Sequence, residues 1–166
     1  LKAVEALNEF GYNISVGCVA RGLENTRWPG RFEVIGKNPV FIVDGAHNPQ
    51  GIEAAAAGIR ALFPNDKVVL LMGVLADKDY KKMISDIVPL AREVFTVTPD
   101  SPRALNADQL AAEIEEQEGV HASPCRSIEE GIVHAVESAG GSGVVCALGS
   151  LYMVGDIRHA YSHLIS

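Results

Sequence analysis

The chain has 166 residues, of which 48% are hydrophobic and 21% charged, and this balance is typical of one globular domain with its own core. Its formal net charge of −7 argues against a nucleic-acid-binding surface, because neutralising phosphates requires clustered lysine and arginine. An anionic small molecule is compatible with that charge, since it needs only a few local cations. No apolar run reaches the roughly 18–20 residues of a membrane span, and the charged N-terminal stretch does not resemble a signal peptide. We expect a cytoplasmic protein without a membrane partner.

The three cysteines, Cys18, Cys125 and Cys146, are odd in number and have no paired spacing. They indicate buried thiols in a reducing compartment and argue against a metal site. The chain has no initiator methionine and begins inside a helical pattern, so we interpret it as a fragment of a longer polypeptide. Residues 1–26 are expected to form two short helices from the end of a preceding domain, the second starting near Ser15. Residues 27–166 are expected to form the main domain.

Strands and helices alternate along the main domain. Strands are predicted at 32–35, 40–43, 67–72, 94–97, 120–122 and 143–148, with the first two forming a hairpin. The helices between them are predicted to begin at the N-cap residues Asn48, Asn106, Ser127 and Ser150, with a further helix from about Tyr80. Asn106 and Ser127 are each followed by a capping-box partner, Gln109 and Glu130. This alternation predicts an α/β fold with a doubly wound, mostly parallel sheet of about six strands flanked by helices.

The most informative stretch, residues 39–64, joins a buried strand to an amphipathic helix through a short polar turn. Asn48 followed by Pro49 supplies an N-cap and an N1 proline, and Pro64 ends the helix. One helical stripe is predicted to face the core: Ile52, Ala55, Ala56, Ile59, Leu62 and Phe63. Asp44 and His47 therefore lie between the carboxyl end of a strand and the amino end of a helix. Open α/β sheets bind ligands at such turns, so both residues are site candidates.

Three strand-to-helix turns share this character, at residues 44–49, 73–79 and 148–152. Such turns lie on one edge of a parallel sheet, so residues distant in sequence are expected to line one cleft there. We expect Arg31, Asp44, Lys78 and Ser150 to meet along this edge, together with His47. The cations among them would make the cleft locally positive within an acidic protein, and Ser150 would add a hydroxyl group and a helix N-terminus.

Each candidate also has a purely structural interpretation. Asp44 can accept backbone N–H bonds in its own turn, and His47 can be a satisfied structural histidine. Lys78 can be a solvated charge between two aspartates, and Arg31 can pair with Glu33 or Asp44. Ser150 is explained equally well as the N-cap of the last helix.

Several familiar signatures are missing from the sequence. There is no GxxxxGK[ST] phosphate loop and no GxGxxG opening a helix. Asp77 and Asp79 make a weak cation site because they flank a lysine, and His134 is interpreted as structural. His159 and His163 are four residues apart but have no evident third ligand. We therefore expect no metal site within this chain.

Five motifs carry a resemblance to a known family: WPGR (28–31), DGAHNP (44–49), GVLADKD (73–79), TPDSPRAL (98–105) and GSLYMVGDIR (149–158). In this order and spacing the chain resembles the C-terminal domain of folylpolyglutamate synthase and dihydrofolate synthase, which belong to the Mur ligase superfamily. The resemblance covers essentially the whole chain and implies a Rossmann-like domain.

The resemblance implies an ATP-dependent ligase that adds L-glutamate to a folate or dihydropteroate carboxylate. ATP first phosphorylates that carboxylate to an acyl phosphate, and the amine of glutamate then attacks it and releases phosphate. In this family the C-terminal domain closes over the nucleotide and holds the incoming amino acid. The phosphate loop and the Mg²⁺ ligands lie in a central domain that is missing here, so the partner is the protein's own N-terminal ATPase domain. We expect the isolated fragment to be inactive and monomeric.

Matched motif by motif, the resemblance implies a role for each candidate residue. Arg31 of WPGR would contact the ATP phosphates, as suits a guanidinium, and Asp44 of DGAHNP would contact the nucleotide ribose. His47, Lys78 and Ser150 would bind the incoming glutamate, whose carboxylates suit an ammonium group and helix N–H groups.

Some alternatives stay open at the level of sequence. Arg103 of SPRAL is a family landmark without an assigned role. The chain could belong to another Mur-type amino-acid ligase, or be a non-catalytic module that binds a small molecule. The motifs do not distinguish a dihydrofolate synthase from a folylpolyglutamate synthase or an enzyme with both activities.

Overall fold

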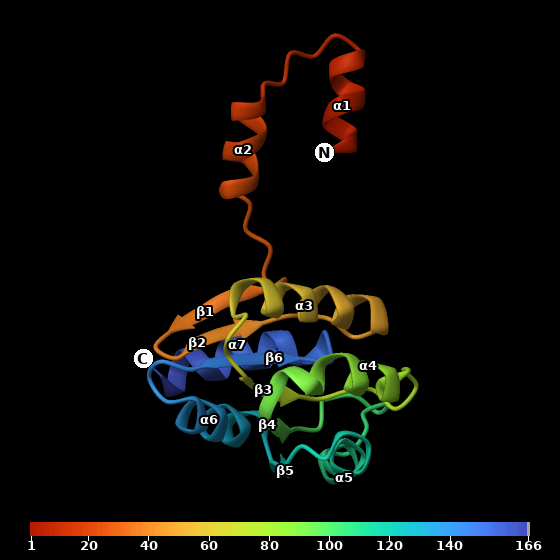
Figure 1. Ribbon diagram of the computed structural model, residues 1–166, viewed down its shortest axis with the longest axis vertical. Helices are drawn as coiled ribbons and strands as arrows, with labels where there is room; N and C mark the ends of the chain where they lie inside the picture. The colour runs from red at the N-terminus through yellow and green to blue at the C-terminus, as the bar shows by residue number, and fades with distance from the viewer. Residues whose placement is uncertain (166) are drawn as a thin grey trace.

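A six-stranded sheet forms the centre of the computed structural model, which describes residues 1–165 (Figure 1). The strand order is β1-β2-β6-β3-β4-β5. The strands are β1 (Glu33–Lys37), β2 (Val40–Val43), β3 (Val68–Met72), β4 (Ala91–Thr96), β5 (Ala122–Pro124) and β6 (Val144–Leu148). All neighbours pair in parallel except β1, which runs antiparallel to β2. The predicted doubly wound, mostly parallel sheet with one hairpin strand is confirmed.

Helices cover both faces of the sheet (Figure 1). One hydrophobic cluster includes residues of α3 (Pro49–Leu62), α4 (Tyr80–Ile87) and α5 (Ala107–Glu118), and the other includes residues of α6 (Ile128–Ala139) and α7 (Tyr152–Leu164). A short 3₁₀ turn, η1 (Val88–Leu90), follows α4. The molecule is thus a three-layer α/β sandwich.

The central strand β3 shows why the strands are continuously apolar. Leu70 and Met72 belong to the cluster under α3, α4 and α5, whereas Val69 and Leu71 belong to the cluster under α6 and α7. Successive side chains of a strand point to opposite faces of the sheet. Because helices cover both faces here, every residue of β3 is apolar, and apolar and polar residues do not alternate along it. All five of its residues are buried.

The helix that follows β2 begins as its sequence predicts. The Asn48 side chain accepts a hydrogen bond from the Gly51 N–H at 2.8 Å, and Pro49 occupies the first turn of α3. The stripe is buried as far as Ile59, but Leu62 is 62% exposed and the prediction was wrong there. Phe63, just past the helix end, packs against the cluster instead.

The predicted N-caps Asn106 and Ser127 are confirmed, but their capping boxes and the cap of the last helix need correction. Asn106 and Ser127 are N-caps, but no hydrogen bond runs back from Gln109 within the described residues. The Glu130 carboxylate accepts from the Arg126 N–H at 2.6 Å rather than from its own N-cap. The last helix begins at Tyr152 with Leu151 as its N-cap, one residue later than predicted.

Strand limits also differ near the β5 edge of the sheet. β4 begins at Ala91, which pairs with Val68, although the charged Arg92 and Glu93 obscured the strand pattern. β5 lies at Ala122–Pro124 instead of 120–122, because these residues pair with β4 while Val120 only packs against the cluster.

The two N-terminal helices, α1 (Lys2–Glu9) and α2 (Val16–Glu24), stand off from the sandwich (Figure 1). Neither contains a buried residue. Ser15 caps α2 as predicted, by accepting from the Cys18 N–H at 3.2 Å. Cys18 itself is exposed, so the prediction of a buried thiol was wrong at this position. Within residues 1–165, no helix has the length and apolar character needed to traverse a bilayer.

Candidate functional site

The three strand-to-helix turns meet at the carboxyl edge of the sheet. Gly149, after β6, donates its N–H to the carbonyl of Ala46 at 2.9 Å. Its φ is +109°, and a Cβ atom at this position would lie 2.4 Å from the carbonyl oxygen of Gly73. Only glycine accommodates this backbone shape and this closeness together. The predicted convergence of the turns at 44–49, 73–79 and 148–152 is therefore present.

The segment before β1 is attached to the turn after β2. Gly45 donates to the carbonyl of Gly30 at 2.7 Å. The Asp44 carboxylate accepts from the Phe32 N–H through Oδ2 and from the Ala46 N–H through Oδ1, both at 2.7 Å. The structural interpretation of Asp44 therefore holds. Each carboxylate oxygen keeps a second lone pair that a ligand hydroxyl group can use.

Arg103 reaches the same edge through the loop after β4. The Arg103 carbonyl accepts from the Ala76 N–H at 2.8 Å, which ties this loop to the turn after β3. The Arg103 guanidinium bonds the Tyr152 hydroxyl at 3.4 Å and the Asp77 carboxylate at 2.9 Å. These two contacts raise the pKa of Arg103 above its usual value and hold the cation in place.

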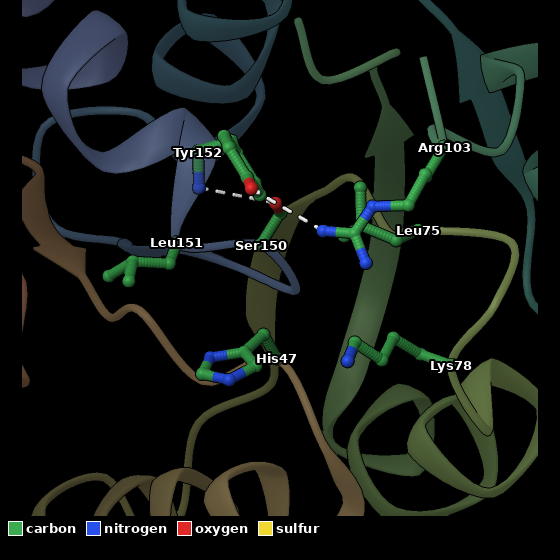
Figure 2. Close-up of a pocket in the computed structure, with 7 residues that line it drawn as sticks. All are labelled: His47, Leu75, Lys78, Arg103, Ser150, Leu151 and Tyr152. Atoms are coloured by element: carbon green, nitrogen blue, oxygen red, sulfur yellow. Dashed lines mark hydrogen bonds between the residues drawn. The ribbon is translucent and has the colours of Figure 1, made fainter. Parts of the chain in front are cut away.

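A cavity of about 290 Å³ lies among these turns (Figure 2). Its lining combines two cations, a histidine and two hydroxyl groups with apolar walls: His47, Leu75, Lys78, Arg103, Ser150, Leu151 and Tyr152. Three predicted site residues, His47, Lys78 and Ser150, are thus brought together. Pockets of this kind, mostly apolar with a few converging polar groups, are typical of small-molecule sites.

Lys78 is the cation of this cavity that lacks a carboxylate partner among residues 1–165. Its flanking aspartates are occupied elsewhere, because Asp77 pairs with Arg103 and Asp79 caps α4. The Lys78 ammonium group points into the cavity (Figure 2). This arrangement favours a ligand anion as its partner.

Ser150 and His47 supply further polar groups. Ser150 is 2% exposed, and its hydroxyl oxygen accepts from the Tyr152 N–H at 3.3 Å. His47 Nδ1 lies 2.8 Å from the carbonyl oxygen of Gly45. A carbonyl only accepts, so this contact assigns the proton of the neutral ring to Nδ1 and leaves a lone pair on Nε2.

A second cavity, of about 510 Å³, adjoins the first on the side of β1 and α3. Arg31, Asp44 and His47 are among its lining residues, with Trp28, Asn48 and Leu151. Arg31 forms no ion pair within the described part of the chain, so the alternative structural interpretation, in which it pairs with Glu33 or Asp44, does not hold. Glu33 instead pairs with Arg158 at 3.2 Å. The five predicted site residues therefore lie along one edge, divided between two adjoining cavities.

Residues 1–165 contain no group of three or more histidine, cysteine, aspartate or glutamate side chains arranged for a metal ion. The rings of His159 and His163 are tilted by 47° with centroids 4.4 Å apart, and no third ligand joins them within the described residues. The described residues therefore offer no set of three side-chain ligands that would hold a metal ion by themselves.

Sequence reasoning missed part of the first cavity. Arg103 was noted only as a motif residue, and Tyr152 was not considered as a site residue. The antiparallel bridge between Leu75 and Ala104 brings the two loops together, and a contact between loops of this kind leaves no periodic pattern in the sequence. The SPRAL motif was the one available signal.

Comparisons with known proteins give three findings. The sequence model of the family described as "Mur ligase, glutamate ligase domain" matches residues 30–151. The chain is 38% identical over 140 residues to a protein of Halobacterium salinarum named as a probable bifunctional folylpolyglutamate synthase/dihydropteroate synthase, covering 84% of this chain and 17% of that protein. It is 31% identical over 158 residues to the dihydrofolate synthase/folylpolyglutamate synthase of Bacillus subtilis, covering 94% and 36%.

A solved structure also matches. The crystal structure of a bifunctional folylpolyglutamate synthase/dihydrofolate synthase with Mn, AMPPNP and L-glutamate bound has a TM-score of 0.80 and 26% identity, over 99% of this chain and 38% of that one. The chain thus spans between about a sixth and two fifths of the length of these proteins.

Proposed function

Because this chain belongs to the Mur ligase family, within its glutamate ligase domain, we propose that it is the C-terminal domain of an ATP-dependent ligase. The ligase adds L-glutamate to the carboxylate of a folate or dihydropteroate through an acyl phosphate. The names of the relatives from Halobacterium salinarum and Bacillus subtilis support a folate acceptor. The solved structure with L-glutamate and AMPPNP bound supports the two ligands that the domain would hold.

The observation that carries this proposal is the pair of cations in the smaller cavity. Glutamate brings two carboxylates, and Lys78 and Arg103 offer two positive donors beside the Ser150 hydroxyl. Hydrogen bonds between charged partners are the stronger kind, and an arginine held from two sides presents its donors in a fixed direction. Asp77 and Tyr152 provide that hold.

The larger cavity is proposed as the nucleotide side. Arg31 has no carboxylate partner among the described residues, and its planar guanidinium suits the phosphate oxygens of ATP. Asp44 would accept a ribose hydroxyl on a lone pair that its backbone bonds leave unused. The divalent metal of the family finds no ligand group among residues 1–165, so we assign it to the part of the ligase outside this chain.

In the reaction, this domain binds and orients rather than activating the phosphates. Lys78 and Arg103 fix the carboxylates of glutamate, and the adjoining cavities set the amine toward the acyl phosphate. Holding two reactants in this way converts a bimolecular step into a reaction within one complex. In favourable cases this lowers the activation barrier by on the order of 7–11 kcal/mol.

The test is an assay of the full-length ligase with dihydropteroate and with tetrahydrofolate as acceptors. We expect ADP release that requires both an acceptor and L-glutamate, and negligible ADP release from the isolated 166-residue chain. Dependence on a different amino acid would identify another Mur-type ligase. Absence of any amino-acid-dependent turnover in the full-length protein would favour a non-catalytic binding module.

Substitution of Lys78 tests the assignment of the amino-acid site in the full-length enzyme. Lys78→Ala removes a charge-assisted bond worth about 1.5–3 kcal/mol, so the glutamate KM should rise about tenfold or more while the ATP KM changes little. Lys81→Ala is the matched control, because Lys81 pairs with Glu113 and lines neither cavity. Equal increases in both KM values for Lys78→Ala would point to a nucleotide contact instead.

A further inference from the structure

His47 lies at the junction of the two cavities. Among residues 1–165, only His47 and Leu151 line both the cavity with Lys78 and the cavity with Arg31. Building on the function proposed above, we propose that His47 is the general base that accepts the proton lost by the incoming amine. Leu151 has no group that could accept it.

The junction is where the bond must form. The acyl phosphate arises on the nucleotide side, and the amino acid enters from the side of Lys78 and Arg103. The nitrogen that attacks therefore reaches the acyl carbon where the two cavities meet. An ammonium group has no lone pair, so the nitrogen must first give up a proton to a nearby acceptor.

The His47 ring can provide that acceptor. Its Nδ1 faces the Gly45 carbonyl at 2.8 Å, so the neutral ring carries its proton there and its lone pair is on Nε2. No hydrogen bond to Nε2 occurs within residues 1–165, and no buried side-chain polar atom there lacks a partner. Nε2 is therefore exposed to solvent on a residue that lines both cavities, and the following turn of α3 is fixed by the Asn48 cap.

The other polar groups around the junction are less suited to this role. Lys78 and Arg103 face His47 across the smaller cavity, and Arg31 and Asp44 lie with it in the larger one. The three cations have no acceptor in their charged forms. Both oxygens of the Asp44 carboxylate accept backbone N–H groups, and the lone pairs that remain are assigned above to a ribose hydroxyl.

The proposed step balances in atoms and charge. Nε2 takes one proton from the ammonium group, and the freed lone pair of the nitrogen attacks the acyl carbon. The new C–N bond forms as the C–O bond to the phosphate breaks, and inorganic phosphate leaves with the electron pair. The nitrogen loses a second proton to the departing phosphate, which becomes HPO₄²⁻. The imidazolium then returns its proton to solvent.

A comparison of two nucleophiles in the full-length enzyme tests this role. Hydroxylamine is an amine that is largely unprotonated at neutral pH, so it can trap the acyl phosphate as a hydroxamate without a base. In His47→Gln we expect kcat with glutamate to fall about 100-fold or more, within the range for general bases, with little change in the glutamate KM. Hydroxamate formation should stay within about threefold of wild type, since it needs no base. This second readout also shows that the variant folds and makes the acyl phosphate.

The pH profile and a control complete the test. The acid limb of kcat with glutamate should be present in wild type and absent in His47→Gln. His134→Gln, which changes a histidine that lines neither cavity, should behave as wild type. An equal loss with both nucleophiles, or a raised glutamate KM with unchanged kcat, would overturn the inference while the proposed function stands. A wild-type enzyme that forms hydroxamate but has no reaction with glutamate would overturn the proposed function itself, and the inference with it.

Discussion

Gly149 lies where β6 gives way to the turn before α7, with a φ of +109° and its N–H bonded to the Ala46 carbonyl. A side chain here would meet the Gly73 carbonyl at 2.4 Å, which is backbone and cannot rotate away. One residue therefore sets the separation of three turns that carry His47, Lys78 and Ser150. At the scale of single residues, the site depends on a position that lines neither cavity.

Replacing Gly149 should lower the free energy of unfolding. Gly149→Ala combines a strained φ with a backbone clash, so we expect a loss of about 2–3 kcal/mol in the free energy of unfolding, measured by denaturant titration. Gly141→Ala is the control, because a Cβ atom at Gly141 meets nothing within 4 Å, and it should change stability by less than about 0.5 kcal/mol. Equal effects of the two substitutions would show that the packing of the turns does not depend on Gly149.

The three thiols should differ sharply in reactivity. Cys18 is exposed on α2, whereas burial raises the pKa of Cys125 to about 11 and raises that of the fully buried Cys146 as well. The thiolate is the reacting form, so a disulfide reagent at mildly alkaline pH should label one thiol rapidly in the native protein and all three in denaturant. Cys18→Ser should abolish the rapid phase. Rapid labelling that survives this substitution would contradict the burial of the other two.

At the scale of elements, strong local signals were predictable, whereas pairings between elements were less so. The start of α3 follows from Asn48 and Pro49 because capping is decided within one turn of chain. The strand limits of β4 and β5 depend on which residues find a partner across the ladder. The reciprocal bond expected at α6 goes to Arg126, since the Glu130 carboxylate reaches that residue's N–H and guanidinium. Strand limits and side-chain partners of this kind depend on the three-dimensional positions of the elements, which the sequence pattern does not reveal.

The N-terminus of α6 offers a pH test of that correction. Hydrogen bonds from the Arg126 side chain and backbone lower the pKa of Glu130 below its ordinary value of 4.5. The folded state thus favours the charged form, and the resulting stability is present above about pH 4.5 and is lost as the pH falls through the lowered pKa. In thermal unfolding, Glu130→Gln should be less stable than wild type near neutral pH and converge with it in acid.

The control for this experiment lies on the same helix. Glu137 makes no ion pair within the described residues, so Glu137→Gln removes an equal charge without removing such a contact. The difference in thermal stability between Glu137→Gln and wild type should not shrink as the pH falls. If Glu130→Gln and wild type stayed equally far apart across the acid range, the carboxylate of Glu130 would not contribute through its ionisation.

For the whole molecule, topology alone predicted much of the site. Parallel strands place their carboxyl ends on one edge, so the grouping of His47, Lys78 and Ser150 follows from the sequence pattern. The division of the site into two cavities could not be predicted from the sequence, because it depends on the volumes of side chains such as Leu151, which lines both cavities. The position of Arg103 could not be predicted either, because it is fixed by the bridge between Leu75 and Ala104, which joins two loops.

The boundary expected at residue 27 gives a prediction about the molecule as a whole. α1 and α2 bury no residue, so they add no apolar burial to the sandwich. Deleting residues 1–26 should therefore leave the free energy of unfolding within about 0.5 kcal/mol of the full chain in a denaturant titration. Truncation after Ser150 is the contrasting variant, because it removes the buried Met153 and Ile157 from the cluster on one sheet face and should abolish cooperative unfolding. A large loss of stability on deleting residues 1–26 would mean that these helices pack against the sandwich in solution and that the boundary is misplaced.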